Sequence, residues 1–284
     1  MSDNELGTFL RIRREAVTPA EVGLPPGGRR RTPGLRRAEL ATLAGVSVDY
    51  LTRLEQGRDR HPSAQVLAAL ADTLGLSSDD RFQLLMLAKA ADGGGSLVCP
   101  GSEPPAQSIR PSVRAVLDRL EPSPAYVVNR LQEVLAHTDG FARLAGPIGL
   151  LDGRPPNIAR FVFTDARARD AYPDWAHVAD EHIAHLKLDS ARDEPHLAAL
   201  VDDLTITAGA PFTDRWSAQV VAPSRRTGID RVVHPEVGEL RLASEVLELS
   251  DDDHQRLVVL LPADEATATA LDRLHHTPLR AVPS

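Results

Sequence analysis

Apolar residues recur at helical spacing through the first third of the chain. Leu6, Phe9 and Leu10 begin the series, with intervals of three and four residues. Proline and glycine interrupt it across residues 17–34, because proline lacks a backbone donor and glycine loses more entropy than other residues in a helix. Helical patterning then returns in four stretches, at residues 35–45, 47–57, 63–74 and 78–91. The pattern predicts an all-α domain of five helices over residues 1–91.

The chain changes character after this region. The sequence ADGGGSLVCPGSEPPAQ (91–107) is too rich in Gly, Pro and Ser to pack a core, so we expect a flexible linker over residues 92–109. Beyond it come two strand-like stretches, at 125–130 and 133–138, and then two helix-like stretches, at 174–188 and 194–204. Three further strand-like stretches follow toward the end of the chain: RVVHP, GELRLASEVLEL and RLVVLLP. This order predicts an α+β domain with an antiparallel sheet over residues 110–276, followed by a short tail at 277–284.

The formal charge of the 284-residue chain is −8, but it is unevenly distributed. Residues 1–91 have a net charge of +2, and the rest of the chain has −10. Within the first part, residues 29–60 have a net charge of +4. An acidic second domain would repel the phosphates of DNA, so this Arg-rich window is the expected footprint of any contact with nucleic acid.

Cysteine content and apolar runs indicate the compartment. The single cysteine, Cys99, cannot form an internal disulfide and falls in the linker, where we interpret it as an exposed thiol. The N-terminus has no apolar signal region, and no apolar run approaches the ~18 residues of a membrane helix. We therefore expect a cytoplasmic protein that does not contact a membrane.

The segment LRRAELATLAGVSVDYLTRLEQGR (35–58) has the properties of a helix-turn-helix motif. Gly45 falls where the first helix should end and where a tight turn favours positive φ. Ser47 offers a hydroxyl N-cap to the second helix. An apolar interior is expected from Leu40, Leu43, Val46, Leu51 and Leu54. In such a motif the second helix enters the major groove of duplex DNA.

Several polar side chains of this region are candidates for contact with DNA. Arg53 is the expected reader of base edges, since an arginine can donate two hydrogen bonds to guanine; the alternative is that it pairs with a nearby acid or a phosphate. Arg36 and Arg37 are expected at phosphates, which position the protein without reading sequence. The full set of predicted DNA-binding residues is Arg29, Arg30, Arg31, Arg36, Arg37, Ser47, Val48, Asp49, Tyr50, Thr52, Arg53, Gln56, Arg58 and Arg60.

The motif resembles the Xre/lambda-repressor-like family, whose common ending Leu-Glu-x-Gly stands here as Leu54, Glu55, Gln56 and Gly57. The longer stretch TPAEVGLPPGGRRRTPGLRRAELATLAGVSVDYLTRLEQGRDRHPS resembles the MmyB-like actinobacterial branch, which carries a Pro/Gly/Arg insertion between its first two helices. The later words PAYVVNR, DAYPDW and HPEVGEL resemble the C-terminal domain of that branch. The resemblance implies a PAS-like domain that binds a small hydrophobic ligand such as a fatty acid non-covalently, with no other cofactor.

The sequence departs from this family where tryptophans usually stand, because residues 132–138 read QEVLAHT. A second domain that is purely structural or dimerising is therefore an alternative to a ligand-binding one. The candidate ligand-binding residues are Tyr126, Phe161, Tyr172 and Trp175. For Trp175 we favour a packing role, anchoring a helix to the sheet, over a place in a pocket wall.

Other chemistry is weakly represented. His177, His182, His185 and His196 cluster near Glu181, but no cysteine accompanies them and a solvated helix face explains them equally well, so we predict no metal. The sequence contains no nucleophile elbow, phosphate-binding loop or HExxH pair, and we predict no enzyme. The leading hypothesis is a homodimeric regulator that binds a pseudo-palindromic operator in double-stranded DNA. The alternative is a protein-interaction module of the antitoxin or anti-regulator type.

Overall fold

The computed structural model of the chain describes residues 4–25, 34–59, 61–91, 105–189, 195–218, 228–249 and 255–276. These residues form two compact units. In the first, residues up to 99 group with residues 198–214; in the second, residues 100–197 group with residues 215–284. Each unit has its own buried apolar core.

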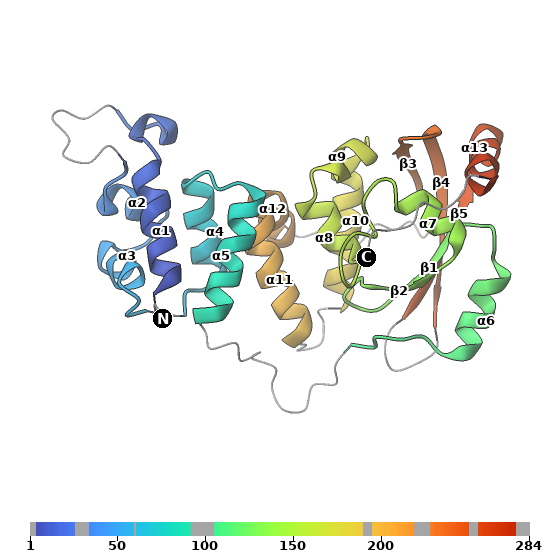
Figure 1. The fold of residues 1–284 in the computed structure, drawn as a ribbon, viewed down its shortest axis with the longest axis horizontal. Helices are drawn as coiled ribbons and strands as arrows, with labels where there is room; N and C mark the ends of the chain where they lie inside the picture. The colour runs from blue at the N-terminus through green and yellow to red at the C-terminus, as the bar shows by residue number, and fades with distance from the viewer. Residues whose placement is uncertain are drawn as a thin grey trace. The chain divides into compact units, whose positions relative to one another are not determined.

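The first unit is helical (Figure 1). Its N-terminal elements are α1 (Glu5–Ala16), the 3-10 helix η1 (Pro19–Val22), α2 (Arg37–Leu43), α3 (Val48–Glu55), α4 (Ala64–Thr73) and α5 (Ser78–Ala91). The unit also includes most of α11 (Pro195–Ala208) and α12 (Ala210–Ser217). On α11, Ile206 is buried in the same apolar cluster as the leucines of α1 to α5. Asp203 of this helix pairs with Lys89 of α5 at 2.8 Å.

The apolar interior predicted for the helix-turn-helix segment is mostly confirmed. Leu40, Leu51 and Leu54 are fully or almost fully buried. Val46 is half-buried against the same cluster. Leu43 is a correction, because its position on the outer side of α2 leaves it 40% exposed.

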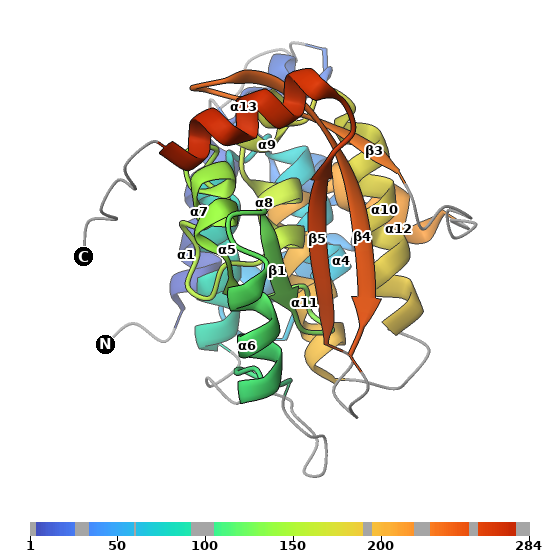
Figure 2. The ribbon, with the colours of Figure 1, turned by 90° about the vertical axis from the view of Figure 1, so that its right-hand side faces the viewer.

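The second unit is built on a five-stranded sheet (Figure 2). The strands are β1 (Ala125–Val128), β2 (Val134–His137), β3 (Ile229–His234), β4 (Gly238–Glu248) and β5 (Arg256–Pro262). Their spatial order is β2-β1-β5-β4-β3, and each neighbouring pair is antiparallel. The helices of this unit are α6 (Pro111–Arg119), α7 (Asp139–Ala145), α8 (Ile158–Thr164), α9 (Arg167–Ala171), α10 (Trp175–Asp189) and α13 (Glu265–His276). The antiparallel sheet that the alternating pattern predicted is confirmed.

Strand alternation gives the sheet two different faces. On one face, Val127 of β1 and Leu257 of β5 pack against Leu117 of α6. The alternate residues of the same strands, such as Tyr126 and Val258, face the other way and line a cavity. Tyr126 and Val258 are register partners, so their side chains stand on the same side of the sheet. One face of the sheet is therefore covered by a packed apolar layer, and the other face, the hollow face, lines the cavity.

The structure adds helices that the apolar pattern did not single out. The short helices α7, α8 and α9 lie between β2 and α10 in the chain, and α13 follows the last strand (Figure 2). Most of the predicted linker, at 92–104, and the predicted tail at 277–284 lie outside the described residues. Across the described chain, no helix combines the length and the apolar character needed to cross a bilayer.

Candidate nucleic-acid interface and ligand pocket

The predicted recognition helix is α3, and its start is fixed by local chemistry. Gly45 has φ +68°, in the left-handed region that favours glycine, so the predicted turn is confirmed. Ser47 is the N-cap of α3, and its hydroxyl oxygen accepts a hydrogen bond from the backbone N–H of Tyr50 at 3.1 Å. This bond satisfies one of the free donors at the helix start. The turn and the cap together set where the helix begins.

The predicted DNA-binding residues of α2, α3 and the turn after them form a largely exposed surface. Eight of these predicted residues have exposed side chains: Arg36, Arg37, Ser47, Val48, Asp49, Arg53, Gln56 and Arg58. Tyr50 and Thr52 are half-buried. The hydroxyl of Thr52 donates to the backbone carbonyl of Val48 at 2.8 Å, so part of its hydrogen-bonding capacity is used within the helix.

Arg53 keeps the freedom that base contact would need. Its side chain is 50% exposed, and it forms an ion pair with Asp59 at an N···O distance of 3.9 Å. Its guanidinium also lies 5.7 Å from the centre of the Tyr50 ring. An exposed pair at this distance contributes little free energy, about 0 to 1 kcal/mol, so it would compete weakly with a base or a phosphate.

Arg37 has a partner that the sequence pattern did not reveal. Its Nε donates to Glu55 Oε2 at 2.7 Å. Arg14 of α1 donates its Nε to the other oxygen of the same carboxylate at 2.7 Å. The Glu55 side chain is 1% exposed, and a second nitrogen of Arg14 donates to the carbonyl of Leu35 at 2.8 Å. The Glu of the Leu-Glu-x-Gly word therefore joins three helical segments, and Arg37 is part of that link.

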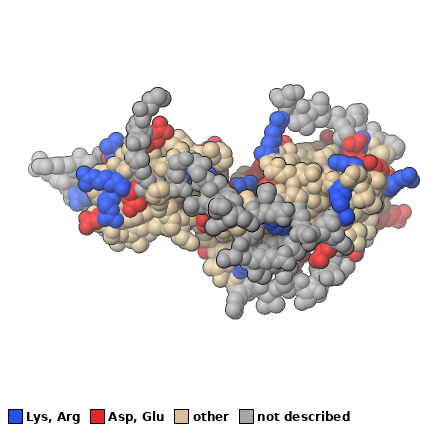
Figure 3. All heavy atoms as spheres, turned by 90° about the horizontal axis from the view of Figure 1, so that it is seen from below, with Lys and Arg blue, Asp and Glu red and all other residues tan. Residues whose placement is uncertain are grey.

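Four further arginines were predicted to bind DNA. Arg29, Arg30, Arg31 and Arg60 lie outside the described residues. On the face drawn in Figure 3, basic side chains in blue stand beside acidic ones in red on the helical unit. One acidic residue, Asp49, lies in the first turn of α3 itself. Among the described residues, this face of the helical unit thus carries basic and acidic side chains next to one another.

The hollow face of the sheet carries an apolar cavity of about 140 Å³. Residues from β1, β3, β4 and β5 form one wall, and residues of α7 and α10 form the opposite wall. Of the four candidate ligand-binding residues, Tyr126 and Tyr172 line it, while Phe161 and Trp175 do not. Burial raises the pKa of both tyrosine hydroxyls above its usual value, so each stays neutral and can act as a hydrogen-bond donor.

Trp175 has a packing role of a different kind from the one predicted. Its indole N–H donates to the carbonyl of Val162 at 2.8 Å, and its ring meets Phe163 edge-on. Arg169 stacks over the ring at 3.8 Å from its centre. Trp175 therefore anchors α10 to α8 rather than to the sheet.

One end of the cavity is polar, and Gln132 helps to build it. Gln132 begins the stretch where the family usually has tryptophans, and it has φ 61°. Its side-chain oxygen lies 2.8 Å from Nδ1 of His182, and its side-chain nitrogen donates to the carbonyl of the same histidine. Burial lowers the pKa of His182 to about 3 and that of His185 to about 4. Both imidazoles are therefore neutral near pH 7.

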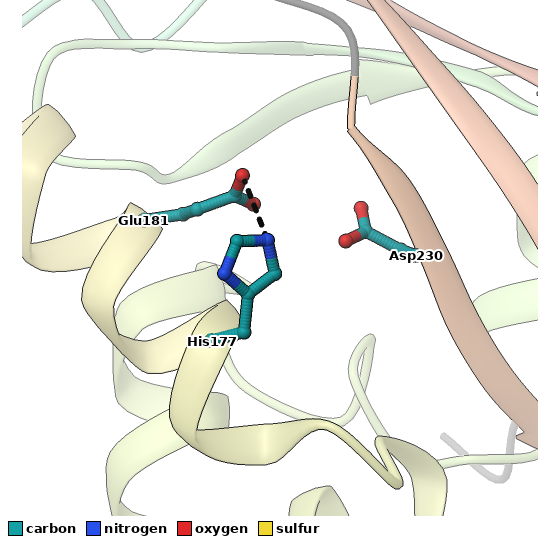
Figure 4. Close-up of side chains that lie close together, drawn as sticks. All are labelled: His177, Glu181 and Asp230. Carbon is teal, nitrogen blue, oxygen red and sulfur yellow. Dashed lines mark ion pairs between the residues drawn. The ribbon is translucent and has the colours of Figure 1, made fainter. Parts of the chain in front are cut away.

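Two carboxylates and a further histidine stand beside these residues (Figure 4). His177 and Glu181 lie one turn apart on α10, and Asp230 faces them from β3. The His177 Nε2 lies 3.4 Å from Glu181 Oε1. Burial raises the pKa of both Glu181 and Asp230. The charge of Asp230 adds to this rise for Glu181, whereas His177 opposes the rise in both carboxylates. Glu181 and Asp230 also line the cavity. The sequence pattern brought His177 and Glu181 together, but it gave no link to Asp230, which lies far along the chain on β3.

Comparison with known families covers both units. The model of the MmyB-like transcription regulator ligand binding domain matches residues 109–274. The model of a helix-turn-helix domain matches residues 5–84. Both are domains of transcription regulators and not of enzymes. Comparison with curated proteins finds none that matches this chain.

These matches agree with the exposed α3 of the helical unit and with the cavity against the sheet. The predicted resemblance is confirmed, and it extends over most of the chain. The chain belongs to the MmyB-like family of helix-turn-helix transcription regulators, with an N-terminal DNA-binding domain and a C-terminal ligand-binding domain.

Proposed function

We propose that this regulator binds a pseudo-palindromic operator as a homodimer in the cytoplasm, and that a small hydrophobic ligand adjusts its affinity for DNA. The observation that carries the proposal is the exposed face of α3, where Ser47 fixes the helix start and Arg53 forms only a long ion pair among the described residues. A dimer of such units would read two half-sites about one helical turn, ~34 Å, apart.

Base reading would depend on the first two turns of α3. Val48 is 43% exposed and offers an apolar contact for a thymine methyl group. Arg53 lies further along the same helix and offers two parallel donors to guanine. Arg36, at the start of α2, is the better candidate for a pure phosphate contact, because Arg37 is engaged by Glu55.

For the second domain, we propose a PAS-like sensor of a ligand no larger than a short-chain fatty acid. An antiparallel sheet with an apolar cavity on one face supports this role. The volume of about 140 Å³ is close to the ~150 Å³ of a protein cavity that accepts benzene. Arg256 lines the cavity and supplies a cation suited to a carboxylate head group.

Genomic immunoprecipitation followed by sequencing tests the DNA-binding proposal. We expect enriched sites that share an inverted repeat with a spacing of about one helical turn. Fluorescence anisotropy with a duplex of that sequence would then give affinity, and light scattering of the complex would give two chains per duplex. One chain per duplex, or enrichment without a shared sequence, would contradict the proposal.

Two arginine variants separate reading from positioning. Arg53→Ala should reduce the preference for the operator over single-base variants by about 1 to 3 kcal/mol at the base that it contacts. Arg36→Ala should weaken binding to all duplexes alike and lower the salt dependence by about one unit of slope. Anisotropy across a panel of base substitutions and salt concentrations measures both. An unchanged base profile in Arg53→Ala would rule out its reading role.

A further inference from the structure

A cluster of possible metal ligands lies at the edge of the cavity. His177, Glu181 and Asp230 each present one nitrogen or oxygen atom, and these atoms all lie within 4.8 Å of one another. Two of the three residues come from one face of α10, at positions i and i+4, and the third comes from β3. Figure 4 shows the three side chains pointing toward a common space between the helix and the strand.

The spacing within the cluster fits a single bound ion. Zinc binds imidazole nitrogen and carboxylate oxygen at about 2.0 to 2.2 Å, which puts two tetrahedral ligands about 3.4 Å apart. His177 Nε2 and Glu181 Oε1 are already at 3.4 Å. The Asp230 carboxylate would complete the group by moving toward them by on the order of 1 Å.

Charge within the cluster is poorly compensated by the protein. Asp230 Oδ1 is buried and finds no hydrogen-bond partner among the described residues, while its other oxygen receives one long hydrogen bond, 3.5 Å, from the Ser244 hydroxyl. Glu181 is half-buried near it and has His177 as its ion-pair neighbour. A buried carboxylate oxygen without a donor is costly, and a cation between the two carboxylates would remove that cost.

We propose that His177, Glu181 and Asp230 bind one divalent transition-metal ion, such as Zn²⁺, at the edge of the ligand cavity. The imidazole nitrogen favours a first-row transition metal over Mg²⁺ or Ca²⁺, which prefer oxygen ligands. The side chain of His177 is 58% exposed, so an ion can reach the site from solvent.

The site has consequences for the cavity. Three protein ligands leave at least one coordination position open, as in zinc sites that bind water or a substrate. Because Glu181 and Asp230 line the cavity, that position would be within reach of a donor atom on a bound ligand. The metal would therefore give the cavity a Lewis-acidic anchor beside its apolar wall. The metal site does not depend on the proposed operator or on a fatty acid.

The test is a titration of the full-length protein with Zn²⁺. The protein is stripped with a chelator and carries no histidine tag, and isothermal titration calorimetry in a non-chelating buffer gives stoichiometry and affinity. We expect one Zn²⁺ per chain, and at least a tenfold weaker affinity in Asp230→Asn and in His177→Ala. Mg²⁺ at the same concentration should give no saturable heat.

Matched controls separate this site from general binding by histidines and acids. Asp174→Asn removes a nearby carboxylate that is not one of the three proposed ligands and that pairs with Arg231. His61→Ala removes an exposed imidazole of the helical unit. Both should bind Zn²⁺ like the unmodified chain. Asp230→Asn keeps the shape of the side chain, and circular dichroism verifies its fold. A wild-type chain without stoichiometric binding, or Asp230→Asn and Glu181→Gln variants that bind as the wild type does, would overturn the site.

A spectroscopic measurement reports on the ligands directly. Co²⁺ in place of Zn²⁺ should give visible absorption bands in the wild-type protein, and Asp230→Asn should change their position and intensity. Identical spectra in the two proteins would show that Asp230 does not bind the ion.

Discussion

Glu55 shows what a single residue contributes to this protein. Its carboxylate is almost fully buried and accepts from both Arg14 and Arg37. Burying the charges of Arg14 and Glu55 is costly, and the cost is offset only while both are paired and hydrogen-bonded. The residue therefore belongs to the framework that holds α3, and not to the surface that meets DNA.

Replacing Glu55 by Gln should destabilise the helical unit by about 3 to 5 kcal/mol, because the variant removes the buried counter-charge of Arg14. Urea unfolding followed by far-UV circular dichroism measures this. Glu15→Gln is the matched control: Glu15 is 53% exposed and pairs with the same arginine at 3.3 Å. It should change stability by less than about 1 kcal/mol. Equal losses in the two variants would contradict the central role of Glu55.

At the scale of an element, the start of α3 is the best-defined feature of the interface. Gly45 allows the turn, and the Ser47 hydroxyl caps the helix that follows. An equivalent serine, Ser63, caps α4, where its hydroxyl oxygen accepts from the N–H of Val66 at 3.3 Å. Ser47 and Ser63 are thus caps of the same chemistry, one on the predicted reading helix and one on a neighbouring helix.

Ser47→Ala and Ser63→Ala should each lower stability by about 1 kcal/mol, since each removes one cap. Their effects on DNA should differ. Ser47→Ala should weaken operator binding severalfold, because the first turn of α3 loses its fixed position, whereas Ser63→Ala should leave the affinity unchanged. Thermal unfolding and anisotropy on the same preparations test this. A similar loss of affinity in both variants would indicate that stability, and not helix position, controls binding.

At the scale of the whole molecule, each of the two units is built from segments that are far apart in the chain. Residues 198–214 fall within the family match of the ligand-binding domain but group with the first 99 residues. Ile206 joins the apolar core of the helical unit, and Asp203 pairs with Lys89. The cavity, in contrast, is lined by residues of the second unit alone.

Hexanoate should raise the unfolding temperature of the full-length protein if the cavity binds a short-chain fatty acid. At a hundred times its Kd, the ligand would add about 2.7 kcal/mol to stability. Ala145→Phe, which fills the cavity, should abolish the shift, and Ala115→Phe, at an exposed position of α6, should retain it. Equal shifts in both variants would place the ligand elsewhere. Binding without a change in operator affinity would contradict the proposed tuning.

The sequence by itself determined the elements that depend on local chemistry. Prolines, glycines and helical periodicity located α2 to α5, and the residues around Gly45 and Ser47 predicted the turn and the cap that the structure contains. Alternation along β1, β2 and β3 to β5 predicted the antiparallel sheet. These features follow from backbone conformation and nearest neighbours, which a sequence records directly.

Tertiary structure decided what depends on residues far apart in the chain. Glu55 meets Arg14 across 41 positions, and Gln132 meets His182 across 50 positions. Asp230 reaches Glu181 only because β3 forms the edge of the sheet beside α10. Long-range pairs of polar side chains leave no periodic signal, since one residue in each strand or helix suffices to make them. The cavity and its polar end are therefore properties of the fold, while the reading helix is a property of the sequence.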